Sequence, residues 1–149
     1  MILKTKETPL VRFRADLPKW LEPVGAAYIE IDARPAGVVN QVFLAGQDRI
    51  VTAQRIRDTA AADDTAKSAA AKETGLDWLG LVYDACVLGW RTNLIDAETN
   101  GPIEPTRATF MDLADVRIPH VTQMFINFQT AILKAGDDAA ADDEATIKN

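Results

Sequence analysis

The stretch that decides the fold is Thr74–Trp90, T-G-L-D-W-L-G-L-V-Y-D-A-C-V-L-G-W, because nearly every position in it is apolar. Asp77 and Asp84 form its thin polar stripe, and they are seven residues apart and therefore on one side of a helix. A helix that is apolar on almost all sides is a buried one. The stretch predicts a central buried helix over residues 76–88.

Local signals set the ends of this helix. Thr74 is suited to the N-cap position, and Gly89 is a typical stop signal. Gly80 in the middle lowers helix propensity, which we expect where another segment of backbone approaches closely.

Two segments of alternating polarity precede the helix. Residues 10–15 alternate between apolar side chains and arginines, and residues 27–33 alternate between isoleucines and acids. The segment 17–25 between them holds two prolines and a glycine, which is typical of a connection. We expect an antiparallel ribbon with arginines opposite acids on its outer side. Helices must cover its apolar side, because two strands alone are only marginally stable.

Residues 38–53 allow two interpretations. Apolar residues recur at three- and four-residue steps after Pro35, which favours helices, with Asp48 as the cap of a second one. The alternative is a hairpin turned at A-G-Q-D. We favour helix, because the sequence continues into an Ala-rich tract over residues 59–73. That tract has no large apolar side chain, so we expect a solvated helix or linker there, with disorder as the alternative.

Turn and cap signals follow the central helix. The dipeptide Asn100-Gly101 predicts a tight turn between two short extended segments, and Thr106 predicts the N-cap of a short helix. Pro119 predicts the start of a final helix with one apolar face. The residues of that face are Val121, Met124, Phe125, Phe128, Ala131 and Ile132.

Gly136 is expected to end the final helix, and the acidic segment 137–149 to be a disordered tail. Residues 1–136 are then a single globular domain. The predicted fold class is α+β, mainly α, with a short N-terminal antiparallel β ribbon packed on a small helical body around the buried central helix.

Composition argues against several classes of function. The chain has one His, one Cys and one Ser, too few for a credible catalytic triad or zinc site. A net charge of −6 and a pI near 4.7 argue against nucleic-acid binding. No apolar run approaches the roughly 20 residues of a membrane helix, and a single Cys suits a reducing compartment. We therefore expect a protein that is not an enzyme and has no cofactor, no metal, and no nucleic-acid or membrane partner.

The order of features around the central helix resembles a known family. An apolar helix ends at Trp90, a Gly-containing turn follows at 100–101, and P-I-E-P-T opens a short helix before an aromatic-rich final helix. This arrangement is similar to the C-terminal half of tail assembly chaperones of long-tailed bacteriophages and prophages. The resemblance covers residues 11–135, and its motif residues 88–110.

The resemblance implies a non-catalytic protein in the cytoplasm of the bacterial host. Chaperones of this family bind the tape measure protein, keep it soluble and pass it to tail tube subunits, and they are generally absent from the finished particle. Self-association is a further expectation. The alternative function is a structural virion component of the tail, neck or baseplate.

Three apolar residues are candidates for partner contact. Trp90 is one, because aromatic residues are enriched at interface hot spots, although a Trp in this place more often belongs to the core, which we favour. Ile126 and Leu133 are seven residues apart and lie more than a third of a turn from the centre of the apolar face of the final helix. They belong either to a second core face or to a seam for another subunit.

Overall fold

A computed structural model describes residues 10–18, 26–116 and 118–148. For residues 143–148 it describes the backbone alone. The expected loose start at 1–9 and most of the expected connection at 17–25 lie outside the described residues. The elements in chain order are β1 (Val11–Asp16), β2 (Tyr28–Ala33), α1 (Gln41–Ala60), α2 (Asp64–Cys86), β3 (Val87–Thr92), β4 (Ile95–Asp96), β5 (Gly101–Pro102), α3 (Arg107–Asp115) and α4 (Pro119–Lys148).

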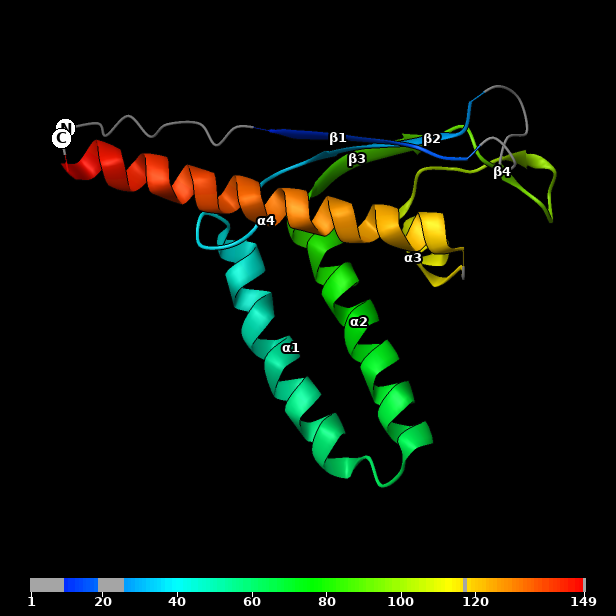
Figure 1. The fold of residues 1–149 in the computed structure, drawn as a ribbon, viewed down its shortest axis with the longest axis horizontal. Coiled ribbons are helices and arrows are strands. Elements are labelled where there is room, and N and C mark those ends of the chain that lie inside the picture. Colours follow the sequence, from blue (N-terminus) through cyan, green and yellow to red (C-terminus); the bar gives the residue numbers. More distant parts are fainter. Residues whose placement is uncertain (1–9, 19–25, 117, 149) are drawn as a thin grey trace.

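The predicted fold class is confirmed: the protein is α+β and mainly α. β1 and β2 form the predicted antiparallel ribbon, with Arg14 opposite Glu30 as the alternation of polarity requires. α4 lies along the apolar side of the sheet, and α1 and α2 extend away from this body as an antiparallel pair (Figure 1). The rings of Phe13 on β1 and Phe128 on α4 meet edge to face at 5.5 Å between centroids.

The sheet has a third strand that the sequence analysis missed. β3 pairs antiparallel with β2, which gives the order β1-β2-β3 and places Trp90 beside Ile31. Residues 87 and 88, predicted as the end of the central helix, therefore belong to a strand. Arg34 N–H donates to the carbonyl of Cys86 at 2.7 Å, which helps to fix the point where the helix gives way to the strand.

The central helix is longer than predicted at its other end. It begins at Asp64, where the side chain of Asp63 accepts a hydrogen bond from Ala66 N–H at 2.7 Å. Thr74, the predicted N-cap, lies inside α2 and is buried. Asp is a strong N-cap residue, and the Ala-rich segment after it favours helix, so the helix starts at the earlier cap. The predicted burial of its second half is confirmed by Leu79, Val82, Ala85 and Cys86.

The helical interpretation of residues 38–53 is confirmed, but as the single helix α1 rather than two. The helix begins after Asn40 and not at Pro35, which is fully buried in the preceding loop. The Asn40 side chain accepts from Phe43 N–H at 3.1 Å and donates to the carbonyls of Pro35 and Ala85, each at 3.0 Å. It is therefore both the N-cap of α1 and a link to the end of α2.

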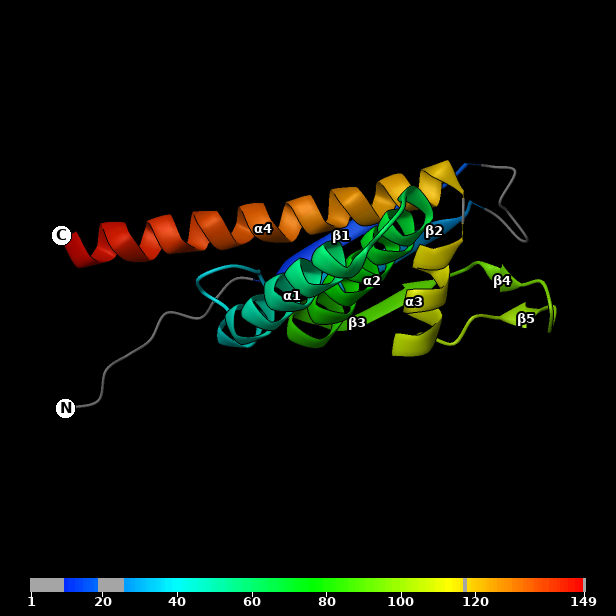
Figure 2. The same ribbon diagram turned by 90° about the horizontal axis from the view of Figure 1, so that it is seen from below.

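The Ala-rich tract at 59–73 forms the far end of the α1–α2 pair. It includes the last residues of α1, a short connection and the mostly exposed start of α2, so the expectation of a solvated helix holds for residues 64–73. Figure 2, turned by 90°, shows the same pair foreshortened and overlapping the body.

The elements after β3 begin and turn where the local sequence signals predict. β4 and β5 pair around the turn at Asn100, whose φ of 55° is of the left-handed kind that Asn tolerates. Thr106 caps α3 through Thr109 N–H at 3.2 Å, and α4 begins at Pro119 as predicted.

The predicted end of the last helix at Gly136 is wrong, because α4 continues to Lys148. The segment expected to be a disordered tail is thus helical over residues 137–148. Gly136 has a different role: the loop before α1 lies directly on it. Ala36 N–H donates to the carbonyl of Ile132 at 3.1 Å, and a Cβ on Gly136 would lie 1.7 Å from the Ala36 carbonyl oxygen. The glycine allows a close approach of backbone instead of a helix end.

Candidate functional site

Trp90 does not belong to an exposed site. Its side chain is 4% exposed, and its ring meets that of Phe110 edge to face at 5.6 Å between centroids. The indole Nε1–H donates to the carbonyl of Thr106 at 3.1 Å. The favoured core interpretation is therefore confirmed, and the burial leaves Trp90 little surface for a partner contact.

Ile126 and Leu133 have the opposite character. They are 50% and 46% exposed, whereas Phe125, Phe128 and Ile132 on the same helix are buried. The structure thus rules out the second core face that the sequence left open. These two residues form an exposed apolar stripe on α4.

The stripe borders two cavities between α4 and the α1–α2 pair. One, of about 620 Å³, lies between α2, the end of α3 and α4, and includes Leu76, Leu79 and Ile126 in its lining. The other, of about 300 Å³, includes Phe43, Trp78 and Leu133. Gln129 lines both. We call this continuous surface the α4 groove.

The elements that form the α4 groove are held by their own contacts, so the groove does not depend on a ligand for its shape. Phe43 and Trp78 bring α1 and α2 together at 6.4 Å between ring centroids. Phe110 on α3 meets Phe125 on α4 edge to face at 5.1 Å. Preformed apolar surfaces of this kind suit the docking of a helix, whose apolar side chains recur at three- and four-residue steps.

Charges in the α4 groove gather at one end of it. Lys72 of α2 and Asp115 of α3 form an ion pair at 3.2 Å, and both are more than half exposed. The rest of the lining is apolar or carries neutral amide and hydroxyl groups. Such a surface is suited to recognising shape and apolar area.

Asp77 and Asp84, the polar stripe of the central helix, connect α2 to its neighbours. Asp77 accepts from Arg57 of α1 at 2.7 Å, and Asp84 takes two hydrogen bonds from Arg107 of α3, at 2.8 and 3.1 Å. The hydrogen bond to Asp84 raises the pKa of Arg107, so the guanidinium keeps its charge. Gly80 gives room to the Arg107 side chain, which would lie 2.9 Å from a Cβ there; the neighbour is a side chain and not the predicted backbone.

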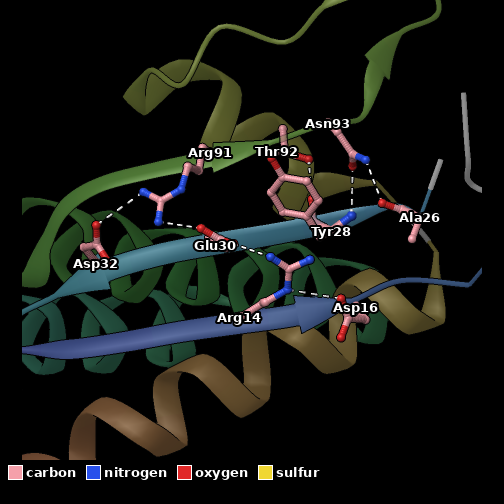
Figure 3. A network of polar contacts seen from close by, with 9 residues as sticks. All are labelled: Arg14, Asp16, Ala26, Tyr28, Glu30, Asp32, Arg91, Thr92 and Asn93. Atoms are coloured by element: carbon pink, nitrogen blue, oxygen red, sulfur yellow. Dashed lines mark hydrogen bonds and ion pairs between the residues drawn. The ribbon is translucent and has the colours of Figure 1, made fainter. Parts of the chain in front are cut away.

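The outer face of the sheet carries a network of ion pairs (Figure 3). Arg14 contacts Asp16 at 3.2 Å, pairs with Glu30, and lies 4.5 Å above the ring of Tyr28. Arg91 of β3 bonds to Glu30 at 2.5 Å and to Asp32 at 3.4 Å. Arg14 and Arg91 thus pair with Glu30 from the two neighbouring strands.

Hydrogen bonds to Asp16 and then Glu30 raise the pKa of Arg14, and the bond to Glu30 raises that of Arg91. Exposed pairs like these contribute little energy each, and here they join all three strands of the sheet. The sequence predicted the arginines opposite the acids of the first two strands, but not Arg91. The only sequence signal for the strand that carries Arg91 was the weak alternation of polarity in V-L-G-W-R-T.

Cys86 is a buried core residue, as its apolar neighbours predict. Burial raises the pKa of its thiol to about 11, which keeps it protonated and unreactive at neutral pH. In the part of the chain that the structure describes, no group of three or more His, Cys, Asp or Glu residues is placed to hold a metal ion.

Among the described residues, no helix is both long enough and apolar enough to cross a membrane.

Comparison with known proteins gives no match: no family model, no curated protein and no solved structure is similar to this chain.

Proposed function

We propose that this protein is a non-catalytic binding protein that holds a helical segment of another protein in the α4 groove. The observation that carries the proposal is the exposure of Ile126 and Leu133, 50% and 46%, at the border of two adjoining apolar cavities. Exposed apolar side chains beside a concave surface are typical of an interface. Their seven-residue spacing matches the repeat of an apolar helix stripe.

The family resemblance gives this binding a biological setting. A tail assembly chaperone acts on the tape measure protein, which is long and helical, and transfers it to tail tube subunits in the cytoplasm of the bacterial host. An apolar groove open to solvent suits a partner that must be held temporarily. We therefore propose the tape measure protein as the occupant, with the tail tube protein as a second partner.

The first test is coexpression with the tape measure protein of the same phage or prophage, followed by affinity purification. We expect the two proteins to copurify, and the double variant I126D/L133D to lose the partner because two buried carboxylates would face an apolar stripe. Since both residues are about half exposed, circular dichroism and melting temperature should stay close to wild type.

A matched control is V42D/I56D on α1. These residues are 61% and 65% exposed, the charge change is the same, and neither lines the α4 groove. The control should retain the partner. Retention by a folded I126D/L133D variant would exclude the groove as the site.

The alternative function, a structural component of the virion, makes a different prediction for purified particles. A chaperone should be missing from them. Finding this protein there in stoichiometric amount would overturn the chaperone proposal and favour the alternative.

A further inference from the structure

One charge on α4 lies just beyond the α4 groove, and it bears on what can occupy the groove. At the end near Ile126, Lys72 and Asp115 neutralise each other. Beyond the other end, one turn past Leu133, the helix presents Asp137, which lines neither cavity. Asp137 follows Ile126 by eleven residues and Leu133 by four, so it lies within about 40° of both around the helix axis.

Asp137 is exposed, and no ion pair to it is found in the part of the chain that the structure describes. Ile126, Leu133 and Asp137 therefore form one line about 16 Å long at 1.5 Å per residue. Two apolar contacts are followed in this line by a negative charge, and the nearest cation in sequence, Lys134, lies about 60° away around the helix. A complementary helix carries two apolar contacts followed by a positive charge.

A second copy of this chain fits that pattern poorly. If two copies of α4 lay parallel about a twofold axis, each Asp137 would face the other, which is repulsive. If they lay antiparallel with Ile126 opposite Leu133, Asp137 would face Thr122, which has no charge. In neither arrangement does a basic residue lie directly opposite Asp137.

We infer that the α4 groove takes an amphipathic helix of a different protein, whose apolar stripe has a Lys or Arg one turn beyond one of its ends, where it pairs with Asp137. This inference rests on the proposed function, because it specifies the chemistry of the helix that the groove binds. The position of the basic residue, after or before the stripe, sets the direction in which the partner lies along α4.

Synthetic helices test this charge preference directly. The probes are Ala-based peptides with leucines at i, i+4 and i+7 and a lysine one turn after or one turn before the stripe, each with a glutamate counterpart. Isothermal titration with the full-length protein should show that one lysine peptide binds more tightly than its glutamate counterpart. Asp137→Asn should weaken that peptide about two- to fivefold, the range for a single exposed ion pair.

Asp138→Asn is the matched control. It removes the same charge from the next residue, which is also exposed but points about 120° away from Ile126 around the helix. It should leave the affinity unchanged, and raising the salt concentration should reduce the Asp137 effect. Asp137→Lys should reverse the preference and favour the glutamate peptide.

The outcomes separate this inference from the proposed function. If no lysine peptide binds more tightly than its counterpart, or if the two Asn variants weaken binding equally, the charge preference is wrong even where the tape measure protein copurifies. If the peptides behave as expected but the tape measure protein never copurifies, the chaperone function fails and the helix-binding chemistry stands. A wild-type dimer in sedimentation that I126D/L133D dissociates would make a second copy the occupant and overturn the inference.

Discussion

Single residues at which backbones meet determine where α4 lies. Gly136 is buried, and the Ala36 carbonyl occupies the space where a side chain would begin. The adjoining hydrogen bond from Ala36 N–H to Ile132 attaches the loop before α1 to the middle of α4. This contact also places Leu133 beside Phe43 and Trp78, so it helps to form the α4 groove.

Gly136→Ala should lower the free energy of unfolding by about 1–3 kcal/mol, because the added methyl group cannot fit without moving a backbone. Chemical denaturation measures the change. Gly75→Ala is the comparison: a Cβ there meets nothing within 4 Å, so this variant should gain about 0.5–1 kcal/mol from helix propensity. Equal changes in the free energy of unfolding for the two variants would mean that the loop at Ala36 does not pack closely against Gly136.

At the scale of elements, the α1–α2 pair has two halves of different character. Its base contributes Phe43 and Leu79 to the main core. Its outer half is held largely by Arg57, which contacts Thr74 at 3.3 Å, Asp77 at 2.7 Å and Glu73 at 3.3 Å. With so little apolar area, the outer half should open more easily than the base.

Arg57→Ala should therefore increase amide hydrogen exchange in the outer half of the pair, near residues 53–74, and leave the base unchanged. The physical reason is the loss of three contacts that cross from α1 to α2. Arg55→Ala, two residues away on an exposed position, serves as the control and should have little effect. Faster exchange throughout both helices would show that the pair opens as one unit.

The whole molecule consists of a body, formed by the sheet with α3 and α4, and a projecting helical pair (Figure 1). The buried residues of the main core include none between 44 and 78. The body is held instead by contacts between segments far apart in sequence, such as Ile31 beside Trp90 and Phe13 against Phe128.

Replacing residues 56–72 with a short glycine-containing turn should leave the body folded. The indole N–H signal of Trp90 should keep its position in NMR spectra, because its hydrogen bond to Thr106 and its contact with Phe110 lie within the body. The denaturant m-value should fall, since less surface is exposed on unfolding. Loss of the native Trp90 signal would instead place the outer pair in the cooperative core.

Local periodicity was sufficient for much of this architecture. The alternation in β1 and β2, the cap at Thr106, the helix start at Pro119 and the burial of the central helix each depend on neighbours within one or two turns, so the sequence alone determined them. The same holds for the spacing of Ile126 and Leu133, which identified a stripe but not whether it was buried.

Contacts distant in sequence decided the rest. Residues 87–92 follow a helix without a break signal strong enough to predict a strand, and they become β3 because the edge of β2 is available for pairing. The local sequence predicts a helix end at Gly136, yet the glycine instead makes room for the backbone of Ala36, one hundred residues earlier in the chain. Burial of Trp90 and exposure of Ile126 and Leu133 depend on which elements pack together. Such pairings have no local signature, because the free energy that selects them comes from surfaces that meet only in the folded chain.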